Sequence, residues 1–189
     1  MQATKYLLLV IDLLNDYFRQ PSPLAAQRDQ LAASVNRLAA SFRKARQPII
    51  WVRQEFAPDL SDAFLKARRE KHYVTIAGTE GCELLPELER HASERVLVKK
   101  RYSAFFGTDL DETLSALRPV ILVLAGINTH ACVRTTAIDA YQRDYEVMVA
   151  SDCVASYDAE HHAVTKRYLD AGIARFVSSA ELDKMLVPS

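Results

Sequence analysis

Runs of apolar residues alternate with amphipathic stretches along the chain. Two runs, Tyr6 to Ile11 and Val120 to Leu124, contain no charged residue and are rich in Val, Ile and Leu. Such continuous runs are typical of strands buried on both faces of a sheet. Together with turn signals, the pattern predicts six strands: Lys5–Ile11, Pro48–Val52, Val96–Val98, Val120–Leu124, Glu146–Ala150 and Ala174–Val177.

The segments between these strands show helical spacing. Leu31, Val35, Leu38 and Phe42, for example, recur every three or four residues. The predicted helices are Ala25–Ala45, Ser61–Arg69 (a short piece), Cys82–Arg90, Asp109–Leu117, the segment that starts around Cys132, Ala159–Ala171 and Ala180–Leu186.

Alternation of strands and helices predicts an α/β fold with a parallel sheet. We expect residues 1–189 to form a single Rossmann-like three-layer domain. Its six-stranded parallel sheet should have the order 3-2-1-4-5-6, with helices on both faces. The long connection from Arg53 to Gly81 is unusual for a compact domain, which favours a functional loop or lid.

The charge balance and the cysteine content argue against several classes of protein, such as nucleic-acid-binding, membrane-bound and disulfide-rich secreted proteins. Lys plus Arg equals Asp plus Glu at 24 each, so no excess charge indicates nucleic acid or an anionic membrane surface. The apolar run at the amino terminus is too short for a signal peptide or a membrane span. Three scattered cysteines do not form a disulfide framework. We therefore expect a cytoplasmic protein that acts on a small molecule.

Candidate chemistry gathers where three predicted strands end. Asp12 follows the first strand, Lys99 follows the third, and Cys132 lies in the first helical turn after the fourth. The carboxyl ends of parallel strands meet at one edge, and the strand order makes the first and fourth strands neighbours. Unpaired N–H groups in a first helical turn favour a thiolate and can also receive an oxyanion. Lys100 is the alternative to Lys99 if the third strand is shifted by one residue.

Other ligand classes do not fit the sequence. The turn after the first strand, Asp12 to Phe18, holds no glycine that would admit a pyrophosphate. A G-x-S-x-G elbow, a P-loop and an H-E-x-x-H helix are also missing from the sequence.

Three blocks of sequence, in order, resemble the isochorismatase-like cysteine hydrolases. They are Asp12-Leu13-Leu14-Asn15-Asp16-Tyr17-Phe18, Gly78-Thr79-Glu80-Gly81 with the Lys99 block, and Gly126 to Val133 followed by Thr136 to Ala140. This family includes nicotinamidases, N-carbamoylsarcosine amidohydrolases, ureidoacrylate hydrolases and isochorismatases. The resemblance implies a catalytic Asp, Lys and Cys, which fall on Asp12, Lys99 and Cys132. It also implies a cis peptide before Asn128 and an oxyanion hole made by the backbone N–H groups of Asn128 and Cys132.

The resemblance implies hydrolysis of a small amide, ureide or carbamoyl C–N bond through a thioester, with release of ammonia or an amine. The alternatives are an isochorismatase-type vinyl-ether hydrolase, a nicotinamidase, and a catalytically silent binding protein. True isochorismatases usually lack the cysteine, so Cys132 favours carbonyl chemistry. We expect no metal and no cofactor, because the region after the second strand lacks the Asp-x-His pair of metal-dependent nicotinamidases and has His72 as its one histidine. The family also suggests a homo-oligomer, a dimer or tetramer.

Substrate contacts are the least specified part of the site. Phe18, Tyr102 and Phe105 border the catalytic positions in sequence and are candidates for a pocket wall, with ordinary core packing as the alternative. Arg53, at the end of the second strand, is a candidate partner for a substrate carboxylate, or a surface charge. Five other residues are assigned no catalytic role: His130, which does not face Cys132 on a helix; Cys82 and Cys153, which we expect to be structural; and His161-His162, expected on a solvated helix face.

Overall fold

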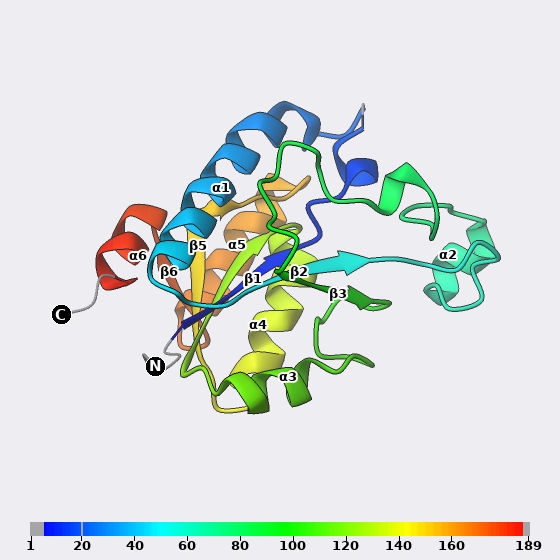
Figure 1. The fold of residues 1–189 in the computed structure, drawn as a ribbon. Helices are drawn as coiled ribbons and strands as arrows, with labels where there is room; N and C mark the ends of the chain where they lie inside the picture. The colour runs from blue at the N-terminus through cyan, green and yellow to red at the C-terminus, as the bar shows by residue number, and fades with distance from the viewer. Residues whose placement is uncertain (1–5, 20, 187–189) are drawn as a thin grey trace.

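The computed structural model describes residues 6–19 and 21–186 (Figure 1). A six-stranded sheet, all of whose pairs are parallel, forms its centre in the order β3-β2-β1-β4-β5-β6. The predicted strand order is therefore confirmed, although Lys5 lies outside the described residues. The strands are β1 (Tyr6–Ile11), β2 (Ile49–Gln54), β3 (Arg95–Lys99), β4 (Ile121–Gly126), β5 (Glu146–Val154) and β6 (Arg175–Val177).

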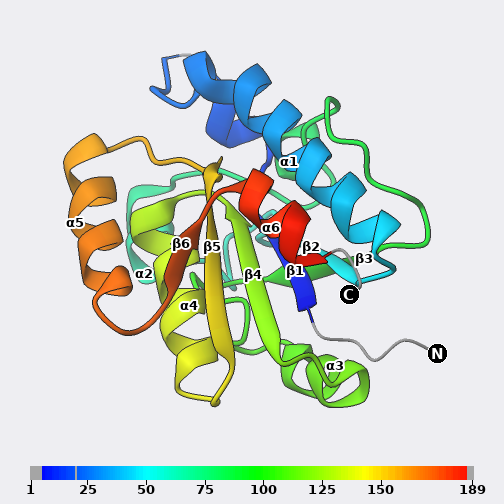
Figure 2. The same cartoon turned by 90° about the vertical axis from the view of Figure 1, so that its left-hand side faces the viewer.

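Helices cover both faces of this sheet (Figures 1 and 2). On one face lie α1 (Arg28–Lys44) and α6 (Ser179–Leu186), and on the other α3 (Leu110–Leu117), α4 (Arg134–Tyr141) and α5 (Ala159–Asp170). The remaining helix, α2 (Leu65–Glu70), belongs to the long connection between β2 and β3. Short helical turns complete the chain at Asn15–Phe18, Ala25–Gln27, Glu80–Cys82 and Thr129–Val133.

The apolar run of β1 is buried because both of its faces meet helices. Leu8 and Val10 belong to the apolar cluster that includes the buried stripe of α1, whereas Leu7, Leu9 and Ile11 belong to the cluster with α3 and α4. All five side chains are fully buried. A strand in this position needs no polar alternation, which explains its continuous apolar sequence.

The predicted helix at Cys82–Arg90 is wrong. Only Glu80–Cys82 forms a helical turn, and the chain beyond it pairs with the segment that follows β1. The Asn15 N–H donates to Glu83 O at 3.0 Å, and the Leu85 N–H donates to Leu13 O at 2.9 Å. Pro86 has no N–H and disfavours helical dihedrals in the residue before it. Hydrogen bonds to the segment after β1 therefore take the place of helical hydrogen bonds for this backbone.

The short helix predicted at Ser61–Arg69 begins later than expected, at Leu65. Two carboxylates accept backbone hydrogen bonds just before it: Asp59 from the Ser61 N–H at 3.0 Å and Asp62 from the Ala57 N–H at 2.8 Å. Aspartates bond readily to nearby backbone in this way and stabilise turns at the expense of helix.

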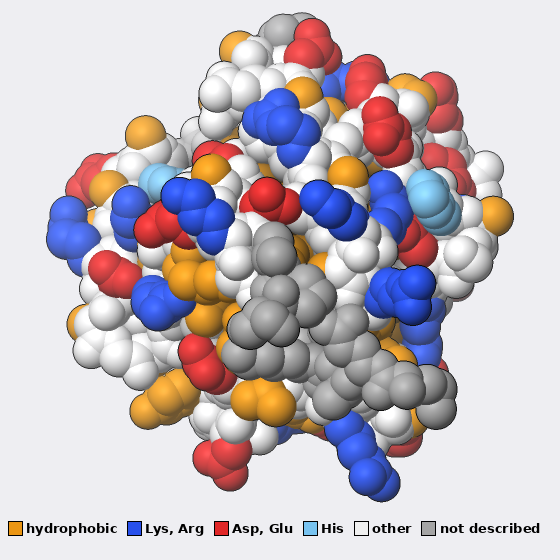
Figure 3. Space-filling view, turned by 60° about the vertical axis from the view of Figure 1, so that its left-hand side comes forward, with side chains coloured by type: hydrophobic (Ala, Val, Ile, Leu, Met, Phe, Trp, Pro, Cys, Tyr) orange, Lys and Arg blue, Asp and Glu red, His pale blue; other side chains and the backbone are white. Residues whose placement is uncertain are grey.

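The surface agrees with the balanced composition. Figure 3 shows acidic and basic side chains interspersed over the described part of the face it presents. Across residues 6–19 and 21–186, no helix has both the length and the apolar character to span a bilayer.

Gly126, the last residue of β4, allows β4 to lie unusually close to β1. Its φ is +111°, and a Cβ built there would lie 2.0 Å from Ile11 O. The Ile127 N–H donates to that same oxygen at 2.9 Å. This close approach joins the ends of β1 and β4, the two strands that lead to Asp12 and Cys132.

Replacing Gly126 with alanine should therefore destabilise the protein. We expect a loss of roughly 2–4 kcal/mol in the free energy of unfolding, from backbone strain plus a clash with main-chain atoms. Gly107→Ala is the matched control, since Gly107 also has a positive φ (+65°) but a Cβ added to it would meet no atom within 4 Å. It should cost only roughly 1 kcal/mol. Urea unfolding curves measure both, and equal losses would contradict the close approach.

Candidate active site

The ends of three strands bring one acid, one amine and one thiol into contact. Lys99 Nζ lies 2.7 Å from Asp12 Oδ2 and 3.5 Å from Cys132 Sγ. The side chains of Lys99 and Asp12 are 0% and 1% exposed, and Cys132 is 5% exposed. The three residues predicted from the strand ends thus form one buried cluster.

The Lys99 ammonium has three acceptor atoms around it. It forms an ion pair with Asp12 and donates hydrogen bonds to Cys132 Sγ and, at 3.0 Å, to Arg101 O. The register of β3 sets this orientation, because Lys99 is the last residue paired with β2, opposite Gln54. Lys100 points elsewhere and forms a half-exposed ion pair with Asp62 at 3.0 Å. The geometry therefore favours Lys99 over its neighbour.

The backbone around Asp12 holds its carboxylate in place. Asp12 has a φ of 55°, in the left-handed region that aspartate tolerates better than most residues. Its N–H donates to Val52 O at 2.9 Å, and its Oδ1 accepts from the Gln54 N–H at 2.9 Å. One carboxylate oxygen thus faces the end of β2, while the other faces Lys99.

Burial shifts the pKa values of both the thiol and the amine. It raises the pKa of Cys132 far above the usual value; the Lys99 charge lowers it, but not enough to compensate. For Lys99, burial lowers the pKa, but the charges of Asp12 and Cys132 outweigh burial, so the net shift is upward. Burial therefore opposes the thiolate expected from the helix-terminal position, whereas the Lys99 charge favours it.

Cys132 lies in a turn that follows β4 directly. Thr129–Val133 is a single turn of π-helix and leads into α4. The Ile127–Asn128 peptide is cis. Ala131 and Val133 both donate their N–H groups to Asn128 O, at 3.0 and 3.2 Å. The Asn128 N–H makes no hydrogen bond with any described residue, so it stays available to a ligand.

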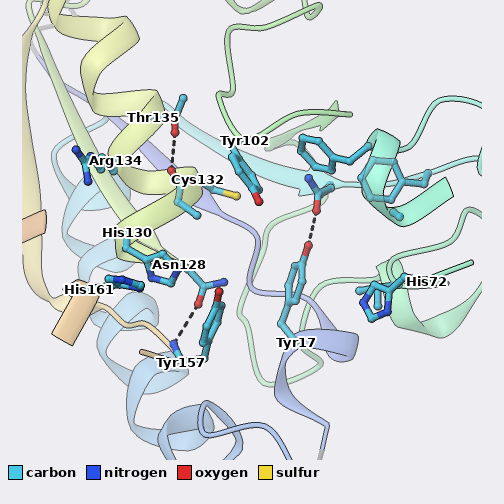
Figure 4. A pocket seen from close by; sticks show the side chains of 16 residues that line it. Tyr17, His72, Tyr102, Asn128, His130, Cys132, Arg134, Thr135, Tyr157 and His161 are labelled. Atoms are coloured by element: carbon cyan, nitrogen blue, oxygen red, sulfur yellow. Dashed lines mark hydrogen bonds between the residues drawn. The ribbon is translucent and has the colours of Figure 1, made fainter. Parts of the chain in front are cut away.

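A cavity of about 630 Å³ opens onto Cys132. In Figure 4 the sulfur faces Tyr102, with Tyr17 and His72 on the far side and Asn128, His130 and Tyr157 below. Aromatic rings make up much of the wall, and Phe64 lies 4.8 Å from Tyr102 between ring centroids. The residues that line it are Tyr17, Gln54, Phe56, Phe64, Ala67, His72, Val74, Tyr102, Asn128, His130, Ala131, Cys132, Arg134, Thr135, Tyr157 and His161.

Of the four predicted substrate contacts, Tyr102 is placed in this wall and three are not. Phe18 packs in the cluster with α1, and Phe105 packs in the cluster with α3 and α4. Their rings therefore belong to the hydrophobic core and do not line the cavity. Arg53 forms ion pairs with Glu55 at 2.6 Å and with Glu83 at 2.8 Å, so its charge is already neutralised.

Several cavity residues were missed by the sequence reasoning. Gln54 follows the same rule as Asp12 and Lys99, since it ends a strand at this edge, and Tyr17 belongs to the motif after β1. Phe56 and Phe64 lie in the long connection, where no periodic signal identifies them. His161 is exposed, as expected, with 65% of its side chain accessible; it also borders the cavity from the start of α5, with its ring 5.5 Å from that of His130.

The Isochorismatase domain model matches residues 6–181, which is almost the whole described chain. This chain belongs to the isochorismatase family. Members of this family are hydrolases, and hydrolysis is the broad class of reaction that the family assigns to the site at the strand ends.

Relatives in this family differ in their activities. The chain is 33% identical over 162 residues to a "probable inactive nicotinamidase" of Arabidopsis thaliana, covering 82% of this chain and 83% of that one. The N-carbamoylsarcosine amidase structure from Thermoplasma acidophilum superposes with a TM-score of 0.78 at 29% identity, covering 93% and 96%. The nicotinamidase PncA structure from Bacillus subtilis gives 0.79 at 29%, covering 92% and 99%.

Metal ligands do not gather in this isochorismatase-family site. Among residues 6–19 and 21–186, no group of three or more His, Cys, Asp and Glu side chains is close enough to hold an ion. His130 bonds through Nδ1 to Ser156, and Asp12 is paired with Lys99. His72 lines the cavity. The donor set therefore does not fit a resident metal with two imidazoles.

Removing the ammonium should make the thiol less reactive. In Lys99→Met the lowering effect of Lys99 on the pKa of Cys132 is lost while the Asp12 charge remains. Because a pKa increase of one unit lowers the thiolate fraction about tenfold, iodoacetamide should alkylate Cys132 at least about tenfold more slowly near pH 8.

Lys100→Met is the matched control for this experiment, since its partner is Asp62 at the surface. Its alkylation rate should equal that of the unmodified protein. Circular dichroism verifies that both variants are folded, and peptide mass spectrometry identifies the labelled cysteine. Equal rates in the two variants would show that the ammonium does not act on the thiol.

Proposed function

We propose that this chain is a cysteine hydrolase that cleaves a small amide, ureide or carbamoyl C–N bond through a thioester. The observation that carries the proposal is the Lys99 ammonium, which contacts both the Asp12 carboxylate and the thiol of Cys132, a residue that lines the cavity. A nucleophile, a base and a fixed positive charge are the groups that acyl transfer to sulfur requires.

In the first step Asp12 takes the proton of the Cys132 thiol, and Sγ attacks the substrate carbonyl carbon. Lys99 stabilises the negative charge that develops on sulfur, which compensates for the high pKa caused by burial. The backbone N–H groups of Asn128 and Cys132 receive the oxyanion. Each such donor contributes about 3–4 kcal/mol to the transition state where this has been measured.

The tetrahedral intermediate then loses the amine. The C–N bond breaks, Asp12 passes its proton to the departing nitrogen, and ammonia or an amine leaves. The resulting acyl group is bound to Sγ as a thioester. Asp12 next takes a proton from water, whose oxygen attacks the thioester carbon. The C–S bond breaks, the acid leaves, and the proton returns to the thiol.

Amide cleavage is favoured over the other candidates by the cysteine. A vinyl-ether hydrolase does not need a thiol in contact with the lysine, and a silent binding protein does not need the acid, the amine and the thiol together. The amidase and nicotinamidase relatives support C–N chemistry. One relative is described as inactive, so the alternative of a catalytically silent binding protein needs an experimental test.

An ammonia-release screen addresses it directly. The purified protein is incubated with a panel of small carboxamides, ureides and carbamoyl compounds, and ammonia is measured. We expect release from at least one member and none with Cys132→Ala. Undiminished turnover by Cys132→Ala would contradict the thioester, and no turnover of any member would favour the silent alternative.

Asp12→Asn should still fold, at a cost of about 3–5 kcal/mol in the free energy of unfolding because Lys99 loses its charge partner, and should lower turnover of the substrate found in this screen by about 10²–10⁴-fold. This is the usual contribution of a general base, and the amide accepts from the Gln54 N–H much as the carboxylate does. Steady-state kinetics and a urea unfolding curve measure the two effects separately. An Asn variant with full activity would require a different proton acceptor.

Chelation tests the expected metal independence. Exhaustive dialysis against a strong chelator should leave turnover unchanged, because the described residues offer no cluster of metal ligands. A loss of activity that zinc or iron restores would show that His72 and its neighbours form a site only when an ion is present.

A further inference from the structure

Thr129 is hydrogen-bonded from two sides at the start of the turn that carries Cys132. It directly follows Asn128, whose N–H is proposed to receive the oxyanion, and it is fully buried. Its N–H and its Oγ1 both donate to Ala155 O, at 2.9 and 3.0 Å, and His162 Nδ1 lies 3.0 Å from the same Oγ1. One carbonyl and one imidazole therefore fix the start of this turn.

The partners of Thr129 show which nitrogen of His162 carries a proton. Ala155 O can only accept, so the one hydroxyl proton of Thr129 must point to it. Oγ1 is then left as an acceptor for the imidazole, and His162 Nδ1 must be the donor. Burial lowers the pKa of His162, and the Lys166 charge lowers it further, so the ring is neutral at about pH 8. Its single proton therefore lies on Nδ1.

Other hydrogen bonds hold the same turn from the side of β5 and α5. The Ala155 N–H donates to Gly126 O at 3.2 Å, and the Tyr157 N–H donates to Asn128 Oδ1 at 3.2 Å (Figure 4). Both donors are backbone groups, which almost any side chain at these positions would leave in place. In the described part of the chain, His162 makes the one side-chain hydrogen bond from α5 to this turn. This contact therefore depends on the identity of the residue.

Loss of the imidazole would weaken the anchor at the start of the turn. Thr129 Oγ1 would keep its acceptor, Ala155 O, but would lose its donor. A donor in an oxyanion hole acts over a narrow range of distances to the oxyanion, about 2.7–3.1 Å. Because the Asn128 N–H is one residue away from Thr129, a shift of Thr129 would move it. A displacement of about 1 Å can lower a reaction rate by about 10²-fold.

We propose that His162 is a positioning residue for the oxyanion hole: its Nδ1–H, through Thr129, holds the Asn128 N–H at the place where the oxyanion forms. This role rests on the proposed amide hydrolysis and adds a residue to its machinery. His162 does not line the cavity, so it touches no substrate there. It should therefore affect the transition state, in which the oxyanion develops, more than it affects substrate binding.

Two substitutions at His162 separate the donor from the bulk of the ring. His162→Phe keeps a ring without a donor, whereas the amide nitrogen of His162→Asn branches from Cγ as Nδ1 does and can donate to Thr129. With the substrate found in the ammonia screen, His162→Phe should lower kcat by about tenfold or more and change KM by less than about twofold. His162→Asn should stay within about threefold of the original kcat. His91→Phe, at an exposed histidine outside the cavity, is the control and should keep the original kcat.

Alkylation of Cys132 distinguishes positioning from a general disturbance of the turn. Iodoacetamide reacts with sulfur by displacement of iodide and forms no oxyanion, so His162→Phe should be alkylated at a rate within about twofold of the original. Parallel falls in alkylation rate and kcat would mean that the whole turn has moved, and would overturn the proposal. An unchanged kcat in His162→Phe would overturn it as well.

Thr129→Val removes the hydroxyl with little change of shape. It should lower kcat and leave alkylation of Cys132 unchanged, which provides the test if His162→Phe does not fold. When both variants fold, adding His162→Phe to Thr129→Val should lower kcat by less than about twofold further, because the two groups act through one hydrogen bond. Independent, multiplicative effects would show that His162 does not act through Thr129.

The tautomer of His162 can be measured without a substrate. Nitrogen-15 NMR of the histidine rings at about pH 8 should show His162 with a proton on Nδ1 and none on Nε2, and the signals missing in His162→Asn assign it. A ring protonated on Nε2 alone would overturn the proposal. Turnover that is independent of His162 would overturn the positioning role and leave the hydrolase proposal standing. If no amide is hydrolysed, the proposed function fails and the positioning role fails with it, even with the expected tautomer.

Discussion

The buried contact between Lys99 and Asp12 is the constraint on which the rest of the site depends. Two opposite charges, both almost fully removed from water, lie 2.7 Å apart. Removing one partner of such a pair typically costs about 3–5 kcal/mol, because the other charge is left buried alone. Besides the ion pair, Lys99 donates hydrogen bonds to Arg101 O and to the Cys132 sulfur. The requirement for charge compensation thus fixes the lysine against the nucleophile.

The fold supplies this contact through strand order. In the order β3-β2-β1-β4-β5-β6, the strands that lead to Lys99, Gln54, Asp12 and Cys132 are adjacent at one edge. Gly126 lets β4 meet β1 closely, and the Gln54 N–H joins the end of β2 to Asp12. The same arrangement that neutralises the ion pair also buries the thiol. Burial raises the pKa of this thiol, and the Lys99 charge acts in the opposite direction.

Features set by local sequence could be predicted, and those set by packing could not. The apolar runs predicted the strands, and the positions just after the strand ends predicted Asp12, Lys99 and Cys132 as site residues. The helix expected at Cys82–Arg90 failed because the backbone near Leu84 pairs with the chain beyond β1, a contact that no local pattern encodes. Phe18 and Phe105 are aromatic residues close in sequence to the catalytic positions, as Tyr102 is. They pack in the core instead of the cavity wall, and the sequence does not distinguish the two environments. The direction of the thiol pKa depends on the extent of burial, which is a property of the whole fold.

The central claim is that Cys132 carries the acyl group during turnover, and trapping the intermediate tests it most directly. A substrate from the ammonia screen is mixed with enzyme, the reaction is stopped with acid within milliseconds to seconds, and the intact protein is weighed. The account predicts an added mass equal to the acyl group, located on the Cys132 peptide and removed by hydroxylamine, with the adduct absent from Cys132→Ala. Rapid turnover without any adduct, together with a Cys132→Ala variant that still releases ammonia, would contradict it and require direct attack by water.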